Sequence, residues 1–198
     1  MKLRNLKDLL LDQLKDLYSA EEQLIKALPK MAKASTSPEL REAFQNHLGE
    51  TEGQLKRLKE VFTKLGSRAE AKLCKAMEGL IKEGDEILKQ KGSANPAVLD
   101  AGLIAAAQKV EHYEIGSYGT ARSFAKLLGE DEAAELLQET LDEEGEADKT
   151  LTTIAENSIN IEAAEGDSDD GEEEEEGEES EEEEEKAAPS SAASRKKR

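Results

Sequence analysis

The sequence predicts an all-α protein: a four-helix bundle with one additional, shorter helix in a long crossover between its second and third long helices. Three observations support this fold class. Apolar residues recur every three or four positions in four long stretches, strand patterns are nearly absent, and Gly, Pro and Ser separate the stretches from one another.

The first two helices follow from the residues that end one and start the next. The first is expected over residues 5–33, before the polar stretch Ala34–Pro38. Ser37 is a good N-cap and Pro38 a favoured first-turn residue, so the second helix begins here. It continues to Leu65 and stops at Gly66. Because the break is short, these two helices should lie antiparallel.

Residues 66–97 form the long connection. Apolar residues at helical spacing predict a shorter helix inside it, interrupted near Gly79 and Gly84. The residues that carry this pattern are Leu73, Met77, Leu80, Ile81 and Ile87.

The last two long helices are again separated by a tight turn. One runs from Pro96 to Leu128 and ends at Gly129, and the other is capped by Asp131 and continues to Asn157 or Ile161. Two antiparallel pairs joined by one long crossover is the connectivity of ferritin-like bundles.

The charge distribution divides the chain into a bundle, residues 1–161, and an acidic tail, residues 162–198. The tail holds 17 of the 46 acidic residues and 5 of the 27 basic ones, so the bundle carries a net charge of only -7 out of -19. With little to bury and dense like charge, the tail is expected to be disordered as far as its basic end, Arg195–Arg198.

Composition also excludes some functions. Nucleic-acid binding is not expected, because phosphate contacts need clustered Lys and Arg and the bundle has a mildly acidic net charge. No stretch reaches the ~20 apolar residues of a membrane span, and no N-terminal signal-peptide pattern occurs. A cytoplasmic protein without a membrane partner is therefore expected.

Each of the four long stretches places an acidic residue inside its apolar stripe, where a bundle should hold hydrocarbon. Burying ionised carboxylates without partners is costly, and several together repel one another. No Lys or Arg occupies these stripe positions. A bound metal cation would resolve the conflict, which is the central hypothesis. The candidate metal ligands are Glu21, His47, Glu50, Glu111, Glu114, Glu144 and Asp148.

Spacing and chemistry define the site further. His47 and Glu50 share a helix face, as do Glu111 and Glu114. Carboxylate oxygens with a little imidazole suit iron, or manganese, better than zinc. Two divalent ions ~4 Å apart, bridged by Glu, is an arrangement that such bundles support.

Four segments resemble the YciE/YciF stress-protein family, over roughly residues 3–160. They are Leu17–Glu21, His47–Thr51, Ala107–Ile115, which contains Glu-His-Tyr-Glu, and Leu141–Glu144. The resemblance implies a ferritin-like fold, a rubrerythrin-type di-iron centre and ferroxidase activity. It further implies a terminal ligand role for Glu21, bridging or switching roles for Glu50 and Glu144, and a paired role for Glu111 and Glu114.

One departure from the usual di-iron pattern concerns Glu-x-x-His. Three residues beyond Glu50 is Gly53, and three beyond Glu144 is Ala147. Either His47 and Asp148 substitute as ligands, or the site is richer in carboxylates than usual and binds metal more loosely, or binds only one ion.

Several readings remain open at the level of sequence. The leading one is a ferroxidase that holds two iron ions and oxidises Fe2+ with O2 or peroxide, in iron handling or stress defence. A second is a non-enzymatic helical scaffold that forms a homodimer through an exposed apolar face. A third is a manganese catalase-like site. Glu21 could instead reach water, His47 could be an ordinary core histidine, and Tyr118 reads as a core aromatic residue.

Overall fold

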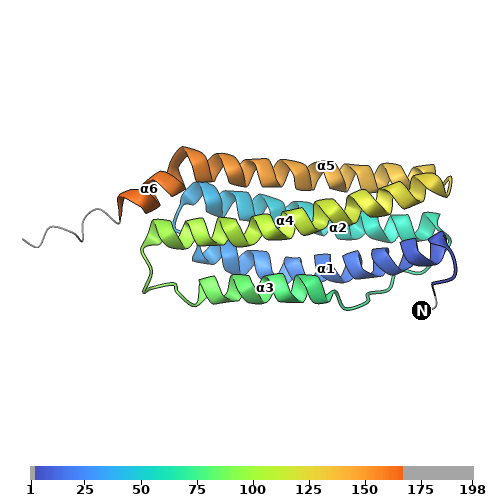
Figure 1. Ribbon diagram of the computed structural model, residues 1–198, viewed down its shortest axis with the longest axis horizontal. Helices are drawn as coiled ribbons and strands as arrows, with labels where there is room; N and C mark the ends of the chain where they lie inside the picture. Colours follow the sequence, from blue (N-terminus) through green and yellow to red (C-terminus); the bar gives the residue numbers. More distant parts are fainter. Residues whose placement is uncertain (1–2, 167–198) are drawn as a thin grey trace, which may run out of the picture.

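A computed structural model describes residues 3–166 of the chain, and every regular element in that range is a helix (Figure 1). The predicted all-α fold class is confirmed. The elements in order are α1 (Leu6–Ala34), α2 (Pro38–Lys64), α3 (Lys75–Leu88), α4 (Pro96–Leu127), α5 (Asp131–Ile154), the π-helical turn η1 (Ala155–Ile159) and α6 (Asn160–Glu165).

The four long helices form the ferritin-like bundle that the connectivity predicts. Helix α1 packs against α2, and α4 packs against α5; contacts between α2 and α5 and between α1 and α4 close the bundle. Helix α3 lies on the outside of the bundle, along α1 and α4, within the long crossover (Figure 1). None of the described helices is long and apolar enough to cross a membrane.

Most helix ends follow the predicted signals. The Ser37 hydroxyl accepts a hydrogen bond from the backbone N–H of Leu40, and Pro38 occupies the first turn of α2. Gly66 and Gly129 end α2 and α4 with φ values of 68° and 72°, which glycine adopts without steric cost. The start of α5 differs from the prediction. Asp131 is its first helical residue rather than its cap, so its charge faces the positive helix end without a capping hydrogen bond.

Two further expectations need correction. Helix α3 is continuous through Gly79 and Gly84, because packing outweighs the propensity cost of about 1 kcal/mol that each glycine carries. Gly84 is buried against α4, where an added Cβ would lie 3.8 Å from that of Ala106. The last helix also continues beyond Ile161, through η1 and α6 to Glu165. The remainder of the acidic tail, residues 167–198, lies outside the described residues.

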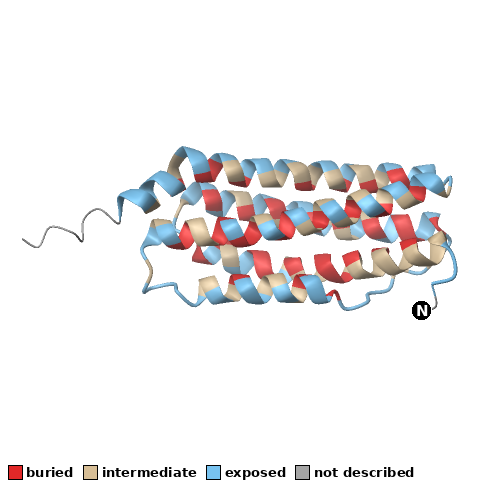
Figure 2. Ribbon diagram, in the orientation of Figure 1, coloured by how far each residue is buried: buried red, intermediate tan, exposed pale blue. Residues whose placement is uncertain are grey.

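The interior has two apolar regions separated by a polar layer, and buried positions face inward along all four long helices (Figure 2). Along α1, Leu17 belongs to one apolar cluster and Leu24 to the other. The fully buried Glu21 lies between these two residues in the sequence. The polar layer thus occupies the middle of the bundle, where each long helix contributes to it.

Candidate metal centre

Five of the seven predicted ligands are buried in the polar layer, and all four long helices contribute. They occupy inward positions because the stripe of each helix continues through them at a spacing of three or four residues. These residues are Glu21 on α1, His47 on α2, Glu111 and Glu114 on α4, and Glu144 on α5, each 7% exposed or less.

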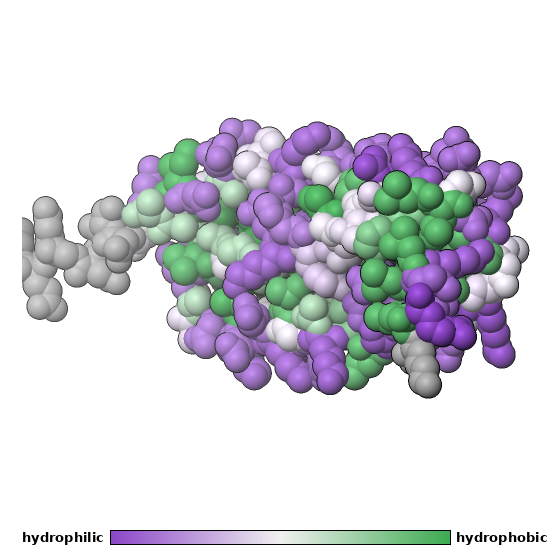
Figure 3. Space-filling model, turned by 45° about the vertical axis from the view of Figure 1, so that its right-hand side comes forward, coloured by the Kyte–Doolittle hydropathy of each residue, from purple (hydrophilic) through white to green (hydrophobic). Residues whose placement is uncertain are grey.

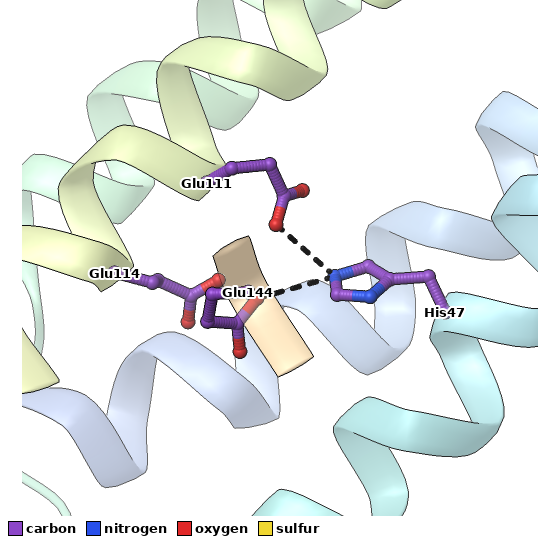
Figure 4. A group of neighbouring side chains, drawn as sticks. All are labelled: His47, Glu111, Glu114 and Glu144. Atoms are coloured by element: carbon purple, nitrogen blue, oxygen red, sulfur yellow. Dashed lines mark ion pairs between the residues drawn. The ribbon is translucent and has the colours of Figure 1, made fainter. Parts of the chain in front are cut away.

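Four of the five form one compact group. His47, Glu111, Glu114 and Glu144 each offer a nitrogen or oxygen atom, and these atoms all lie within 4.8 Å of one another. Nε2 of His47 points toward both α4 and α5, at 3.5 Å from Oε2 of Glu111 and 3.7 Å from Oε2 of Glu144 (Figure 4). One cation placed among them could therefore contact side chains from three helices.

The group leaves its polar atoms without partners. Both carboxylate oxygens of Glu114 and of Glu144 are buried and accept no hydrogen bond from the protein. The same holds for Nε2 of His47 and Oε2 of Glu111. Across residues 3–166, neither Lys nor Arg forms an ion pair with these three glutamates. Folded proteins almost always satisfy buried polar groups, and a cluster of this size could be satisfied by a ligand that supplies positive charge.

The buried glutamates of the layer all have raised pKa values. Burial, together with the neighbouring Glu144 carboxylate, raises the pKa of Glu21 to about 8. Burial also raises the pKa of Glu111 to about 8. The pKa values of Glu114 and Glu144 lie well above the usual range, chiefly because of burial and then of the surrounding carboxylates. Without a cation, the layer must hold protons near neutral pH.

His47 is held in place by a carboxylate at its other ring nitrogen. Nδ1 lies 3.1 Å from Oε2 of Glu50, so Nε2 is directed at the group of four. Burial alone would lower the pKa of His47, but the hydrogen bond with Glu50 and the charge of Glu144 raise it above its ordinary value. A carboxylate that orients an imidazole in this way is typical of histidine metal ligands.

Glu21 adjoins the group of four without belonging to it. Its Oε1 accepts a short hydrogen bond from the hydroxyl of Tyr118, and its Oε2 is buried without a partner. Tyr118 is itself fully buried, as expected for the core aromatic residue that the sequence suggested. Its hydroxyl also fixes a carboxylate of the layer, a role that apolar periodicity could not reveal.

The other two predicted ligands lie outside the group of four. The side chain of Glu50 is 48% exposed and reaches the layer only through His47. Asp148 is partly buried and accepts a hydrogen bond of 3.0 Å from Nε2 of Gln108. Its other neighbour is Nε2 of His112, at 3.3 Å. Both carboxylates already have partners, in contrast to those of the group of four.

A second set of polar residues borders the layer and was not singled out from the sequence. Arg57 on α2 forms two hydrogen bonds with the carboxylate of Glu143 on α5, at 2.7 and 2.9 Å. Gln54 is fully buried and donates to the same carboxylate, while its Oε1 has no partner. Gln54 continues the inward register of α2 beyond His47, so the helical spacing could have identified it.

The residues present fit a divalent metal. Several buried carboxylates and one imidazole match the donors that iron and manganese accept in helix bundles. Glu111, Glu114, Glu144 and His47 would hold the ion, and Glu21 is buried in the same polar layer. The absence of thiolate from the group argues against a structural zinc site.

Comparisons with known proteins agree with this fold. The family model for DUF892, described as a domain of unknown function, matches residues 5–164. Protein YciF of Escherichia coli K12 is 45% identical over 164 residues, which are 82% of this chain and 98% of that protein.

Solved structures give the same picture. The crystal structure of the Escherichia coli stress protein YciF matches with a TM-score of 0.75 at 46% identity, covering 79% of this chain and 98% of that one. YcfI of Rhodopseudomonas palustris, described as a candidate structural protein, matches with a TM-score of 0.74 at 44% identity, covering 78% and 97%. A Xanthomonas campestris protein shares the fold, with a TM-score of 0.66 at 21% identity over 83% of this chain and 99% of that one.

Proposed function

Because this chain belongs to the DUF892 family of YciF-like stress proteins, we propose that it is a di-iron carboxylate protein that oxidises Fe2+ with O2 or peroxide. The observation that supports the proposal is the set of unpartnered buried oxygens on Glu114 and Glu144, beside Nε2 of His47. A protein that needed this layer only for stability would gain by filling it with apolar side chains.

The chain's own residues would perform two tasks. His47 and the three glutamates would hold Fe2+ at buried positions between the helices. Glu21 and Glu111 retain protons near neutral pH, and they would release these protons to the reduced oxidant when a cation is bound beside them. Bound iron supplies the redox chemistry: with peroxide, two Fe2+ ions each give one electron, and two protons complete the formation of two waters.

Aerobic titration with Fe2+ tests the proposal. We expect the ultraviolet absorbance of Fe3+ to rise until about two ions per chain have been added, and to do so much more slowly in Glu111→Gln. The matched control is Glu52→Gln, which removes an exposed glutamate of α2 and should behave as the wild type. Wild-type protein that neither binds nor oxidises iron would refute the assignment. Oxygen release from peroxide by Mn2+-loaded protein would favour the catalase-like alternative.

A scaffold that forms homodimers is the second candidate, and a surface feature favours it. Figure 3 shows apolar side chains gathered toward one end of the visible face, amid mostly hydrophilic residues. Large exposed apolar residues of the described chain include Leu127, 75% exposed, and Leu3, 57% exposed. Contiguous apolar surface of this kind often marks an interface between proteins. Sedimentation of wild type and Leu127→Ser tests it, since only the former should form a dimer.

A further inference from the structure

A pocket of about 170 Å³ lies between α2 and α5, next to the group of four. Helix α2 contributes one wall, helix α5 contributes the other, and Glu111 of α4 lies at the inner end. The residues that line it are Ala43, Phe44, Asn46, His47, Glu50, Glu111, Glu146, Ala147, Thr150 and Leu151.

The inner end of the pocket is the candidate metal centre. His47 and Glu111 belong both to the pocket lining and to the group of four. Their Nε2 and Oε2 atoms are buried and lack hydrogen-bond partners, and the two side chains are only 8% and 3% exposed. An ion that reached the bottom of the pocket would therefore meet two unsatisfied donor atoms of the site.

The outer end of the pocket opens at the surface and is acidic. Four lining residues are exposed: Asn46, Glu50, Glu146 and Thr150. The side chain of Glu146 is 73% exposed and that of Glu50 is 48% exposed, and Glu50 also contacts His47. No Lys or Arg lines this pocket, although Lys149 lies 3.3 Å from Glu146 at its margin. Carboxylates thus mark both the rim and the floor.

The pocket walls between the rim and the floor would let a cation pass without binding it. Ala43 and Ala147 leave room on facing helices, and Phe44 and Leu151 offer no polar atoms that would hold an ion midway. The volume is enough for about five or six waters, so a cation could move through it with part of its hydration shell. Three further pockets within residues 3–166 include no residue of the group of four in their lining.

We infer that the pocket between α2 and α5 is the port through which a divalent cation reaches the centre, with Glu146 attracting the ion at the rim and Glu50 passing it to His47. The inference rests on the proposed function for the presence of a metal site at its floor. Charged residues at the mouth of a cleft raise the association rate of oppositely charged ligands, and they do so most strongly at low salt.

The test follows the rate of Co2+ uptake by metal-free protein under argon, from the visible absorbance of the bound ion after rapid mixing. Glu146→Lys reverses the charge at the rim, and Glu135→Lys makes the same change at an exposed position of α5 outside the pocket. Thr150→Phe obstructs the rim, and Thr153→Phe places the same bulk one turn further along α5, outside the lining. All four positions are exposed, so the fold should tolerate each change.

We expect the uptake rate constant to fall about tenfold or more in Glu146→Lys and in Thr150→Phe, and to stay near the wild-type value in both controls. The number of ions bound at equilibrium should not change, because neither rim residue belongs to the group of four. The charge effect should also shrink as salt is added. Wild-type uptake with unchanged rates in both rim variants would overturn the port while leaving the metal site intact. Wild-type protein that takes up no ion would overturn both.

Discussion

Asp100 and Glu114 are carboxylates of the same helix, α4, and both are almost completely buried. Asp100 lies near the start of α4 and faces the α1–α2 turn. It accepts hydrogen bonds from the backbone N–H groups of Thr36 and Ser37, at 3.0 and 2.7 Å, and from the Thr36 hydroxyl at 2.6 Å. Glu114, four turns along, accepts none at either oxygen.

The two carboxylates differ in their hydrogen-bond partners: Asp100 has donors within the fold, and Glu114 has none among the described residues. Donors built into the α1–α2 turn compensate the burial of Asp100, so its charge stabilises the structure directly. Glu114 instead faces Glu21, Glu111 and Glu144, which raise its pKa further once burial has done so. A cation bound in the layer would compensate the burial of Glu114, and the predictions below test the difference between the two carboxylates.

The largest expected effect is the pH dependence of stability in protein freed of metal by chelation. Glu21 and Glu111 have pKa values of about 8 in the folded protein and about 4.5 when unfolded. Between these values the folded state binds more protons than the unfolded state, so stability should fall as pH rises from about 4.5 to 8. The loss should be on the order of several kcal/mol, since each pKa unit corresponds to about 1.4 kcal/mol. Urea unfolding across this range measures it, and a flat profile would contradict it.

Removal of the well-partnered carboxylate should be nearly as damaging. Asp100→Ala leaves the donors of Thr36 and Ser37 without an acceptor, and we expect a loss of about 3 kcal/mol in the free energy of unfolding. Asp100→Asn, which keeps one acceptor oxygen, should lose less. Chemical denaturation of both variants measures the difference. Equal stability of Asp100→Ala and wild type would mean that the hydrogen bonds contribute nothing.

Removal of the unpartnered carboxylate should have the opposite sign. Glu114→Met replaces a buried carboxyl group that has no hydrogen-bond partner with an apolar side chain of similar length, so metal-free protein at pH 8 should gain about 2 kcal/mol. The gain should be smaller at pH 5, because the raised pKa of Glu114 favours its uncharged form as the pH falls. Thermal unfolding at both pH values checks this. A destabilised Glu114→Met at pH 8 would show that the carboxylate has a structural partner after all.

The smallest expected effect concerns the residue that orients His47. Glu50→Gln keeps a side chain that can still contact Nδ1 but removes the negative charge, so affinity for Co2+ should fall about tenfold. Isothermal titration under argon measures the affinity, with Glu52→Gln as the exposed control on the same helix. A complete loss of binding would instead place Glu50 among the direct ligands.

The sequence predicted the fold well because its signals are local. Ser37 with Pro38 and the glycines at 66 and 129 specify where helices start and end, and the short breaks specify antiparallel pairs. Continuity of α3 through Gly84 was not predictable, because the contact with Ala106 that favours it joins two distant helices. The π-helical turn η1 likewise has no local signal that periodicity can detect.

For the candidate site, periodicity identified the face of each helix but not its final rotation. Residues three apart differ by about 60° around a helix, so His47 and Glu50 could each have faced inward. In the folded bundle His47 faces inward, while Glu50 lies at the rim of the pocket and contacts Nδ1 of His47. The ion pair between Arg57 and Glu143 depends on α2 and α5 becoming neighbours. Because the two residues are 86 positions apart, no local sequence pattern predicts this pair.

The most direct test for a cation among the buried carboxylates is the anomalous diffraction of crystals soaked in Mn2+ after chelation. We expect a strong peak among His47, Glu111, Glu114 and Glu144, which disappears in Glu114→Met crystals treated identically. Peaks confined to surface carboxylates, with the buried oxygens paired to one another through protons, would contradict it.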